Sequence, residues 1–130
     1  MDVIEVATQR RRQLVDITSF VQRAVAAAEV VEGVCHVYIP HTTAAVLINE
    51  NADPDVGDDI LAALVAMLPR LPWKHAEGNS DAHVLATLVG DSVLVPIAGG
   101  ELALGRWQGV YLLELDGPRK REVRVTCLRA

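Results

Sequence analysis

Three of the chain's four histidines lie in two short segments that are dense in side chains able to bind a metal ion or a phosphate. The first segment is PHTT at residues 40–43, followed by NENADP at residues 49–54. The second is HAEGNSDAH at residues 75–83. Imidazoles and carboxylates are costly to gather near an apolar core unless they are paired or bind a ligand. We therefore expect these segments to form a functional site.

The second segment has the composition of a metal site. His75 and Glu77 are two residues apart, as are Asp81 and His83, and in an extended chain such pairs face the same side. Two imidazoles with a third histidine or a carboxylate suit zinc or another divalent cation such as magnesium. We predict His41, His75 and His83 as metal ligands, with Glu77 and Asp81 in catalytic roles.

A polar surface loop explains the same segment equally well, with residues 79–81 only forming turns. The histidine spacing matches neither a zinc finger nor the H-E-x-x-H motif. His41 follows a predicted strand directly, and strand ends that lead into loops are where sites are commonly built. A histidine that only caps the strand end is an equal alternative there. We predict Thr42 and Thr43, which follow it, as substrate-binding residues.

Glu50 ends a run whose three preceding apolar residues, 46–48, indicate a buried strand. A carboxylate at the edge of a core can have a raised pKa and act as a general base, so we predict a catalytic role for Glu50. We expect its neighbour Asn49 to contact substrate. Asp53 is better explained as a helix N-cap, because Pro54 follows it.

A further polar group lies near the C-terminus in the sequence GRWQ at residues 105–108. The glycine allows close approach of a ligand, and the guanidinium of Arg106 offers a fork for phosphate or carboxylate. We predict Arg106 and Gln108 as substrate-binding residues. Trp107 could contact an aromatic substrate, although a core or interface role is more typical of tryptophan.

Composition excludes several classes of protein. A chain of 130 residues that is 51% hydrophobic forms one domain with a real core. Its net charge of −5 argues against a nucleic-acid binder, and the basic runs at 10–12 and 119–121 read as solvated hairpin tips. The two cysteines, Cys35 and Cys127, read as reduced core residues. With no signal peptide and no apolar run long enough to span a membrane, we expect a soluble cytoplasmic protein.

The periodicity of apolar residues predicts mostly strands with two or three helices. Strands are expected at residues 2–8, 12–17, 34–40, 43–50, 92–97, 106–115 and 121–128. Helices are expected from Thr18 or Ser19 to about Glu32, where Gly33 stops the helix, from Asp53-Pro54 to about Leu68, and over 81–89. The last two strands, joined by an Asp-Gly-Pro turn, have the pattern of a hairpin. Strands and helices do not alternate as βαβ units, so we predict one α+β domain over residues 1–130 with mostly antiparallel strands.

Taken together, these segments resemble the YjbQ family, also called UPF0047. The resemblance rests on Pro40-His41-Thr42-Thr43-Ala44, Asn49-Glu50-Asn51 with Asp53-Pro54, residues 75–83 and Gly105-Arg106-Trp107-Gln108. These motifs occur in the family's order and spacing over nearly the whole chain. One departure is Arg106, because many relatives carry threonine between the glycine and the tryptophan.

The resemblance implies a small α+β domain with a β-sandwich-like core and two or three helices. It implies a homotrimer with pockets near the subunit boundaries. The pocket residues that it implies are His41, Glu50, His75, Glu77, Asp81 and His83. The expectation of an oligomer also has a physical basis, because strand 106–115 is apolar on both faces and such strands are covered on both faces by helices or a partner. We expect the C-terminal hairpin to contribute to that interface.

The activity implied by the resemblance is that of a thiamine-phosphate synthase. Such an enzyme joins hydroxymethylpyrimidine diphosphate to thiazole phosphate and releases pyrophosphate, here with a divalent metal ion. The sequence contains neither a D-D-x-x-D run nor a P-loop for the diphosphate. Two alternatives stay open: a metal-dependent hydrolase or lyase acting on a small phosphorylated metabolite, and a non-catalytic trimer that binds a metal or ligand.

Overall fold

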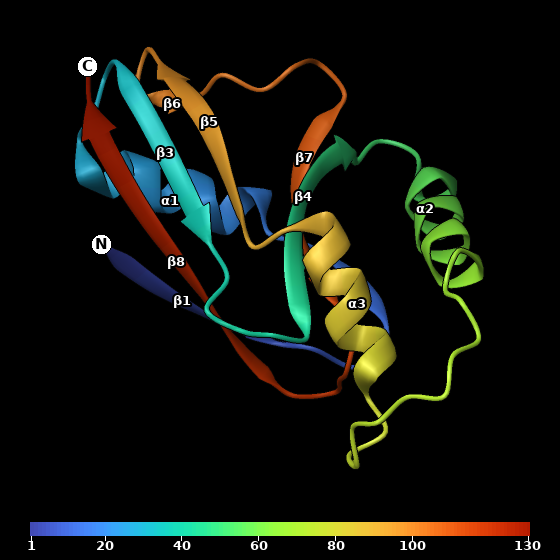
Figure 1. The fold of residues 1–130 in the computed structure, drawn as a ribbon. Helices are drawn as coiled ribbons and strands as arrows, with labels where there is room; N and C mark the ends of the chain where they lie inside the picture. Colours follow the sequence, from blue (N-terminus) through green and yellow to red (C-terminus); the bar gives the residue numbers. More distant parts are fainter.

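The chain folds into two antiparallel sheets and three helices (Figure 1), as described for all 130 residues by a computed structural model. The five-stranded sheet has the order β1-β8-β3-β5-β6. Its strands are β1 Asp2–Ala7, β8 Lys120–Arg129, β3 Gly33–Tyr38, β5 Ser92–Ala98 and β6 Glu101–Leu102. The three-stranded sheet has the order β2-β7-β4. Its strands are β2 Gln13–Asp16, β7 Gln108–Glu114 and β4 Ala44–Glu50.

Three helices complete the fold: α1 Thr18–Ala28, α2 Pro54–Ala66 and α3 Ser80–Val89. The Asp53 side chain caps α2 by accepting a hydrogen bond from the backbone N–H of Asp55 at 2.9 Å, as predicted. Helix α1 ends at Ala28, four residues earlier than expected, because Glu29 adopts a left-handed conformation. Gly33, expected as the helix stop, instead opens β3.

Two apolar cores give the molecule its layers. The larger core lies between the two sheets, where Val37 and Val125 of one sheet meet Val46 and Leu112 of the other, and α1 packs against it. The smaller core lies on the opposite face of the three-stranded sheet, under α2 and α3. The predicted α+β class with antiparallel strands is confirmed. The helices cover the second apolar face of β7 within one chain, so its two-sided pattern requires no partner.

The predicted C-terminal hairpin is wrong. Strand β7 pairs with β2 and β4, whereas β8 pairs with β1 and β3 in the other sheet. Both are central strands with a hydrogen-bonded neighbour on each edge, so neither has a free edge at which the other could pair. The Asp116-Gly117-Pro118 sequence therefore connects two sheets, and residues 8–12 do the same between β1 and β2.

The cysteines lie where the sequence predicted. Cys35 on β3 is directly opposite Cys127 on β8, and both thiols are free. Burial, followed by the neighbouring Cys127 thiol, raises the pKa of Cys35 to about 12. No helix in the structure has both the length and the apolar character needed to cross a membrane.

Three connections between the sheets meet at a buried ion pair of Glu114 and Arg121. These connections are β1 to β2, β3 to β4 and β7 to β8. Arg121 is only 2% exposed and Glu114 is fully buried. The prediction of a solvated tip at residues 119–121 therefore fails for Arg121, because the chain turns inward to change sheets.

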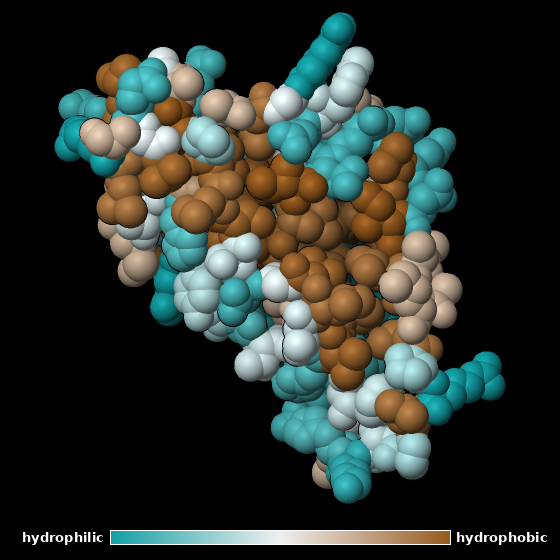
Figure 2. Space-filling model, turned by 45° about the horizontal axis from the view of Figure 1, so that its top comes forward, coloured by the Kyte–Doolittle hydropathy of each residue, from teal (hydrophilic) through white to brown (hydrophobic).

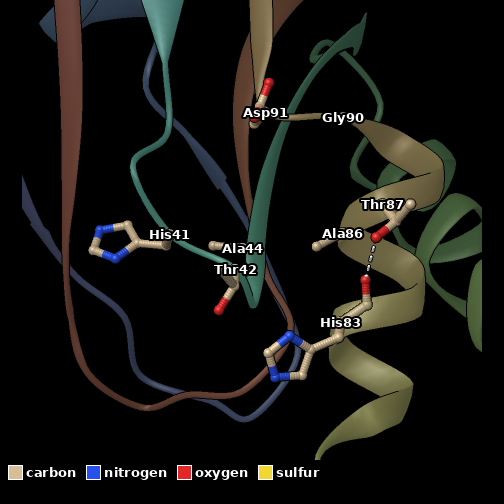
Figure 3. A pocket seen from close by; sticks show the side chains of 8 residues that line it. All are labelled: His41, Thr42, Ala44, His83, Ala86, Thr87, Gly90 and Asp91. Carbon is tan, nitrogen blue, oxygen red and sulfur yellow. Dashed lines mark hydrogen bonds between the residues drawn. The ribbon is translucent and has the colours of Figure 1, made fainter.

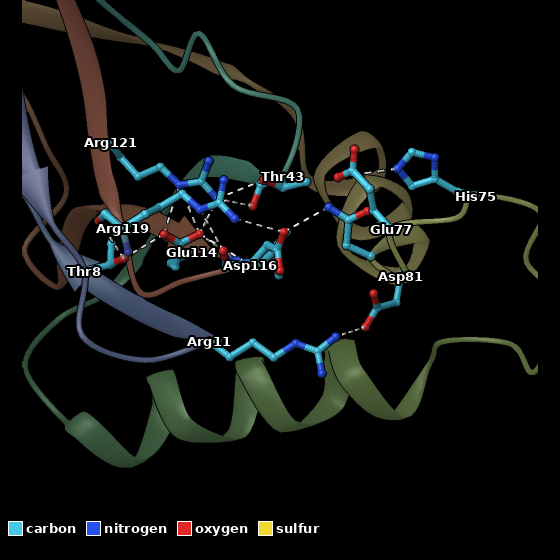
Figure 4. A network of polar contacts seen from close by, with 12 residues as sticks. Thr8, Arg11, Thr43, His75, Glu77, Asp81, Glu114, Asp116, Arg119 and Arg121 are labelled. Carbon is cyan, nitrogen blue, oxygen red and sulfur yellow. Dashed lines mark hydrogen bonds and ion pairs between the residues drawn. The ribbon is translucent and has the colours of Figure 1, made fainter.

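Hydrogen bonds tie all three connections to this pair (Figure 4). Arg121 Nε donates to both carboxylate oxygens of Glu114, at 2.9 and 3.1 Å. Its Nη2 donates to Glu114 and to the carbonyl and hydroxyl oxygens of Thr43, the latter at 3.0 and 2.9 Å. Thr8 Oγ1 donates to Glu114 at 2.7 Å. The pair thus holds residues from each connection in one network.

The network keeps the Glu114 carboxyl ionised. Burial by itself raises the pKa of Glu114, but hydrogen bonds from Arg121, Thr8 and the Asp116 backbone together outweigh it, so the pKa lies below its ordinary value of 4.5. The approach of the connections is also close. A Cβ at Gly117 would overlap the carbonyl oxygen of Arg10 and the side chain of Glu114, so only glycine fits there.

We predict that Arg121→Met lowers the free energy of unfolding by about 3–5 kcal/mol, because it leaves the Glu114 charge buried without a partner. The matched control is Arg119→Met, whose half-exposed guanidinium pairs with Asp116; its expected effect is about 0–1 kcal/mol. Urea denaturation of both variants measures the difference. Equal losses would contradict a special role for the buried pair.

Acid should weaken the same network. Because the pKa of Glu114 is lower in the folded chain, the unfolded chain takes up the proton first, and stability falls as the pH drops below 4.5 and through the lowered folded pKa. We predict that Glu114→Gln is less stable at pH 7 and loses less stability than the wild type between pH 5 and pH 3. Urea titrations across that range test this, and parallel pH profiles would refute it.

Candidate functional site

A pocket of about 440 Å³ lies between the β3–β4 connection and α3 (Figure 3). This volume is in the range of small-molecule sites. Its lining residues are His41, Thr42, Ala44, His83, Ala86, Thr87, Gly90 and Asp91. The pocket therefore joins the two histidine-containing segments that the sequence singled out.

Backbone hydrogen bonds fix both walls of the pocket. Ile39 N donates to the carbonyl of Asp91 at 2.8 Å, and Val46 N donates to the carbonyl of Gly90 at 3.1 Å. These bonds tie the connection and β4 to the turn that follows α3. Thr43, one residue beyond the lining residue Thr42, is buried and held by Arg121. Its predicted place in substrate binding is thus taken by a structural contact.

His41 makes a specific hydrogen bond at the pocket wall. Its Nε2 accepts from the backbone N–H of Glu122 at 2.8 Å. Burial, followed by the positive charge of Arg121, lowers the pKa of His41 below 6.5. The imidazole is consequently neutral at pH 7, with its second nitrogen, Nδ1, carrying the proton.

Asp81 and His83 do not form the extended pair predicted for them, because the helix predicted over 81–89 is present. Helix α3 begins at Ser80, so Asp81 and His83 lie within it. Residues two apart on a helix point about 200° away from each other. His83 accordingly lines the pocket, while Asp81 Oδ2 accepts from Arg12 at 2.6 Å and from Arg11 at 3.1 Å. The two side chains therefore serve different parts of the molecule.

Part of the predicted metal set does converge. The rings of His75 and His83 meet edge to face with centroids 5.6 Å apart. His75 Nε2 also lies 3.8 Å from an oxygen of the exposed Glu77. Within one chain, however, no three His, Cys, Asp or Glu side chains gather as metal ligands do. His41 moreover uses a ring nitrogen for Glu122, so the three-histidine set does not fit a metal ion in a single chain.

The remaining predicted residues lie at the other end of β4. That strand runs from Ala44, beside the pocket, to Glu50, which faces Gln108 across the sheet. At about 3.3 Å per residue, its ends are roughly 20 Å apart. One chain therefore does not bring Glu50 or Asn49 to His41.

The far end of β4 has its own local contacts. The Glu50 carbonyl accepts from the Tyr111 hydroxyl at 3.0 Å, and Gln108 Oε1 accepts from Gly105 N at 2.8 Å. The Arg106 guanidinium lies 4.9 Å from the ring centroid of Trp107, which is 55% exposed. Trp107 is therefore not a core residue, and its predicted interface role is not tested by one chain. The exposed Arg106 is free to reach a ligand or a neighbouring chain.

The sequence reasoning missed Thr87 and Asp91 in the pocket wall. Thr87 follows His83 by one helical turn and donates its hydroxyl hydrogen bond to the His83 carbonyl at 2.8 Å. The i, i+4 spacing from His83 was the available signal once α3 was expected. Asp91 directly follows Gly90, between α3 and β5. A carboxylate at such a helix-to-strand turn could have been recognised as a candidate.

The whole chain is similar to known proteins. It matches the family model described as UPF0047 protein YjbQ-like over residues 2–130. The UPF0047 protein MJ1081 of Methanocaldococcus jannaschii is 46% identical over 123 residues, covering 93% of this chain and 88% of the relative. The UPF0047 protein YugU of Bacillus subtilis is 40% identical over 126 residues, covering 93% of both.

Solved structures agree with these matches. An uncharacterised YjbQ/UPF0047 protein from Clostridium acetobutylicum superposes with a TM-score of 0.95 at 46% identity, covering 98% of this chain and 100% of the other. A protein of unknown function from Sulfolobus solfataricus gives a TM-score of 0.93 at 37% identity, covering 99% and 96%. The sequence, the fold and the pocket motifs thus lead to one conclusion: the chain belongs to the YjbQ/UPF0047 family, whose function is uncharacterised.

Proposed function

We propose that the pocket between His41 and His83 binds a small phosphorylated metabolite and catalyses a thiamine-phosphate synthase-like transfer. The observation that carries this proposal is that hydrogen-bonding groups and a carboxylate line the same small cavity. His41, Thr42 and His83 supply hydrogen-bonding groups on one side, and the side chain of Asp91 lies apart from them (Figure 3). Such a cavity fits a ligand that carries an anionic group and a cationic or N–H-bearing ring.

The proposed transfer needs one group that binds phosphate and another that stabilises a cation, and the pocket has candidates for both. The thiazole nitrogen attacks the methylene carbon of hydroxymethylpyrimidine diphosphate, a carbon–nitrogen bond forms, and the carbon–oxygen bond to pyrophosphate breaks. The leaving group takes the electron pair of that bond, while the thiazole ring becomes a cation. A carboxylate at Asp91 stabilises the cation, and donors beside His41 bind the phosphate. In this proposal Asp81 and Glu77 act indirectly, through Arg12 and His75.

We propose further that a second chain completes the site. Glu50, Asn49, Arg106 and Gln108 lie too far from His41 in one chain to share its ligand, so they reach a pocket only across a subunit boundary. Large apolar side chains also remain exposed on the outer face of the five-stranded sheet and on α3, including Leu94 at 65%, Leu128 at 57% and Leu88 at 61%. Figure 2 shows a broad hydrophobic area on one face of the molecule. A homotrimer would cover such surface and bring the two residue groups together.

We expect purified protein to form thiamine phosphate from the two phosphorylated precursors, and Asp91→Asn to lower kcat/KM by about 10–100-fold, because a neutral amide stabilises the thiazolium poorly. Asp59→Asn, on the exposed side of α2, is the matched control and should leave the rate unchanged. Chromatographic detection of thiamine phosphate gives the rates. No product above the heat-denatured control, or no effect of Asp91→Asn, would exclude the transfer at this pocket.

Subunit sharing can be tested with two inactive variants. We predict that His83→Ala and Glu50→Gln each abolish most activity, and that co-expressing the two chains restores roughly a quarter of it, as random pairing at shared boundaries requires. Light scattering reports the number of chains in each preparation. A stable monomer, or mixed chains that stay inactive, would contradict a site completed by a neighbour.

A second candidate is a metal-dependent hydrolase or a metal-binding trimer. The observation that favours it is the edge-to-face contact of His75 with His83. Their imidazoles fit two positions of a zinc site whose other ligands a second chain would have to supply. Calorimetric titration with zinc or magnesium should then show binding that His75→Ala abolishes and His36→Ala, on the outer sheet face, preserves. Equal binding by both variants, or none by the wild type, would remove this candidate.

A further inference from the structure

We propose that His41 is a neutral hydrogen-bond donor held in one tautomer, and that it presents Nδ1–H to an anionic oxygen of the ligand and does not ligate a metal ion. This proposal rests on the pocket assigned above and specifies how that pocket recognises its ligand. It replaces the metal-binding role that the sequence suggested for His41.

The β3–β8 ladder ends before it reaches Glu122. In that ladder Tyr38 lies opposite Arg124, so an extended β3 would place Pro40 opposite Glu122. Strand β3 ends at Tyr38, and its backbone no longer supplies a carbonyl to the Glu122 N–H. The His41 imidazole takes that place, because its Nε2 accepts from Glu122 N at 2.8 Å. A backbone amide can only donate, so this contact requires an unprotonated Nε2.

The hydrogen bond from Glu122 selects one tautomer of His41. A neutral imidazole has one N–H and one acceptor nitrogen, so an accepting Nε2 leaves the hydrogen on Nδ1. For Nδ1 to bind a metal ion, Nε2 would have to carry the proton. Two N–H groups would then face each other across 2.8 Å. The Glu122 amide therefore opposes metal ligation by His41 while its contact is kept.

Hydrogen bonds on both sides of His41 in the chain hold this arrangement in place. Arg121, the residue before Glu122, binds both the carbonyl and the hydroxyl of Thr43, two residues after His41. Ile39, two residues before His41, is fixed by its bond to Asp91. The donor amide and the segment that carries the imidazole are thus both tied to Arg121, and that segment is tied on its other side to the turn after α3. Tight positioning of this kind favours a single ring orientation.

The charges around His41 act on its pKa in both directions. Burial lowers this pKa most, and Arg121 and, more weakly, Arg119 lower it further, while Glu122 and Glu114 raise it. The ring therefore binds an anion by hydrogen bonding and not as a cation.

The free donor of His41 lies on the side of the ring away from Glu122. In Figure 3 one ring nitrogen of His41 faces β8. The other does not face β8, and the Thr42 hydroxyl and the His83 ring lie apart from it around the same open space. A phosphate or a carboxylate supplies an anionic oxygen that can accept from Nδ1–H, so the ligand's anionic group is expected beside His41 in the pocket.

The tautomer can be measured without any assay of activity. The chain has four histidines, so two-dimensional long-range proton–nitrogen NMR of ¹⁵N-labelled protein resolves each ring, and the signals lost in His41→Gln assign His41. At pH 7 we expect the pattern of a neutral Nδ1–H ring. A neutral Nε2–H ring, a protonated ring, or a shift to a metal-bound pattern on adding zinc would each overturn the proposal.

Two variants with inorganic phosphate as the probe test the donor itself. In His41→Asn the amide NH₂ can occupy the Nδ1 position, whereas in His41→Gln the amide reaches the Nε2 position and can still accept from Glu122. We expect His41→Gln to weaken phosphate binding by about tenfold or more and His41→Asn to retain most of it, in keeping with loss of a hydrogen bond to a charged group. Thermal unfolding of both variants checks that the fold is kept.

The opposite ranking, equal loss in both variants, or no phosphate binding by the wild type would overturn the donor role. The tautomer measurement is independent of these affinities and of any turnover. An inactive protein with the expected tautomer and ranking would leave the proposal intact and reject only the transferase function. A neutral Nε2–H ring or a protonated ring in an active enzyme would reject the role proposed for His41 and leave the transferase function intact.

Discussion

The Glu114–Arg121 ion pair is the constraint on which the arrangement of this molecule depends. The chain changes sheets at the β1–β2, β3–β4 and β7–β8 connections, and each change exposes backbone groups that have left one ladder and not yet joined another. A buried guanidinium with several donors, facing a carboxylate with two acceptor oxygens, satisfies groups on all three connections at once. An apolar pair of the same volume could fill the space but could not satisfy those groups. Crossing between sheets thus explains why a charge pair is buried in a domain this small.

The same pair brings the scaffold into contact with the pocket. Arg121 holds Thr43, and the next residue along β8 donates its amide to His41, so the wall of the pocket is an extension of the buried network. Loops carry the functional groups, but these loops are fixed by bonds to the sheets and to the turn after α3. A preorganised donor needs such support, since a freely rotating imidazole would lose much of its binding energy in becoming ordered.

Local signals in the sequence predicted the elements well and their partners poorly. The Asp53-Pro54 cap and the alternation of Cys35, Val37 and Ile39 depend on neighbouring residues, and the structure agrees with both. The hairpin of β7 and β8 failed because a turn sequence does not reveal which edge the next strand will join. The buried Arg121 was missed for the same reason, since its partner Thr43 is 78 residues away. The pairing of Asp81 with His83 failed because both lie in the helix that the sequence predicted over 81–89, and residues two apart on a helix face different directions.

The candidate site shows the same limit at a larger scale. His41 and Glu50 are close in sequence, yet the strand between them is extended and separates them by its own length. Nearness in a motif therefore predicts nearness in space only when the intervening chain turns back. If both ends of β4 serve one reaction, symmetry must bring them together, because a copy of the chain can place its far end against the near end of another. The exposed leucines of the outer sheet face supply a physical reason for such contact, and the position of Glu50 gives it a consequence for chemistry.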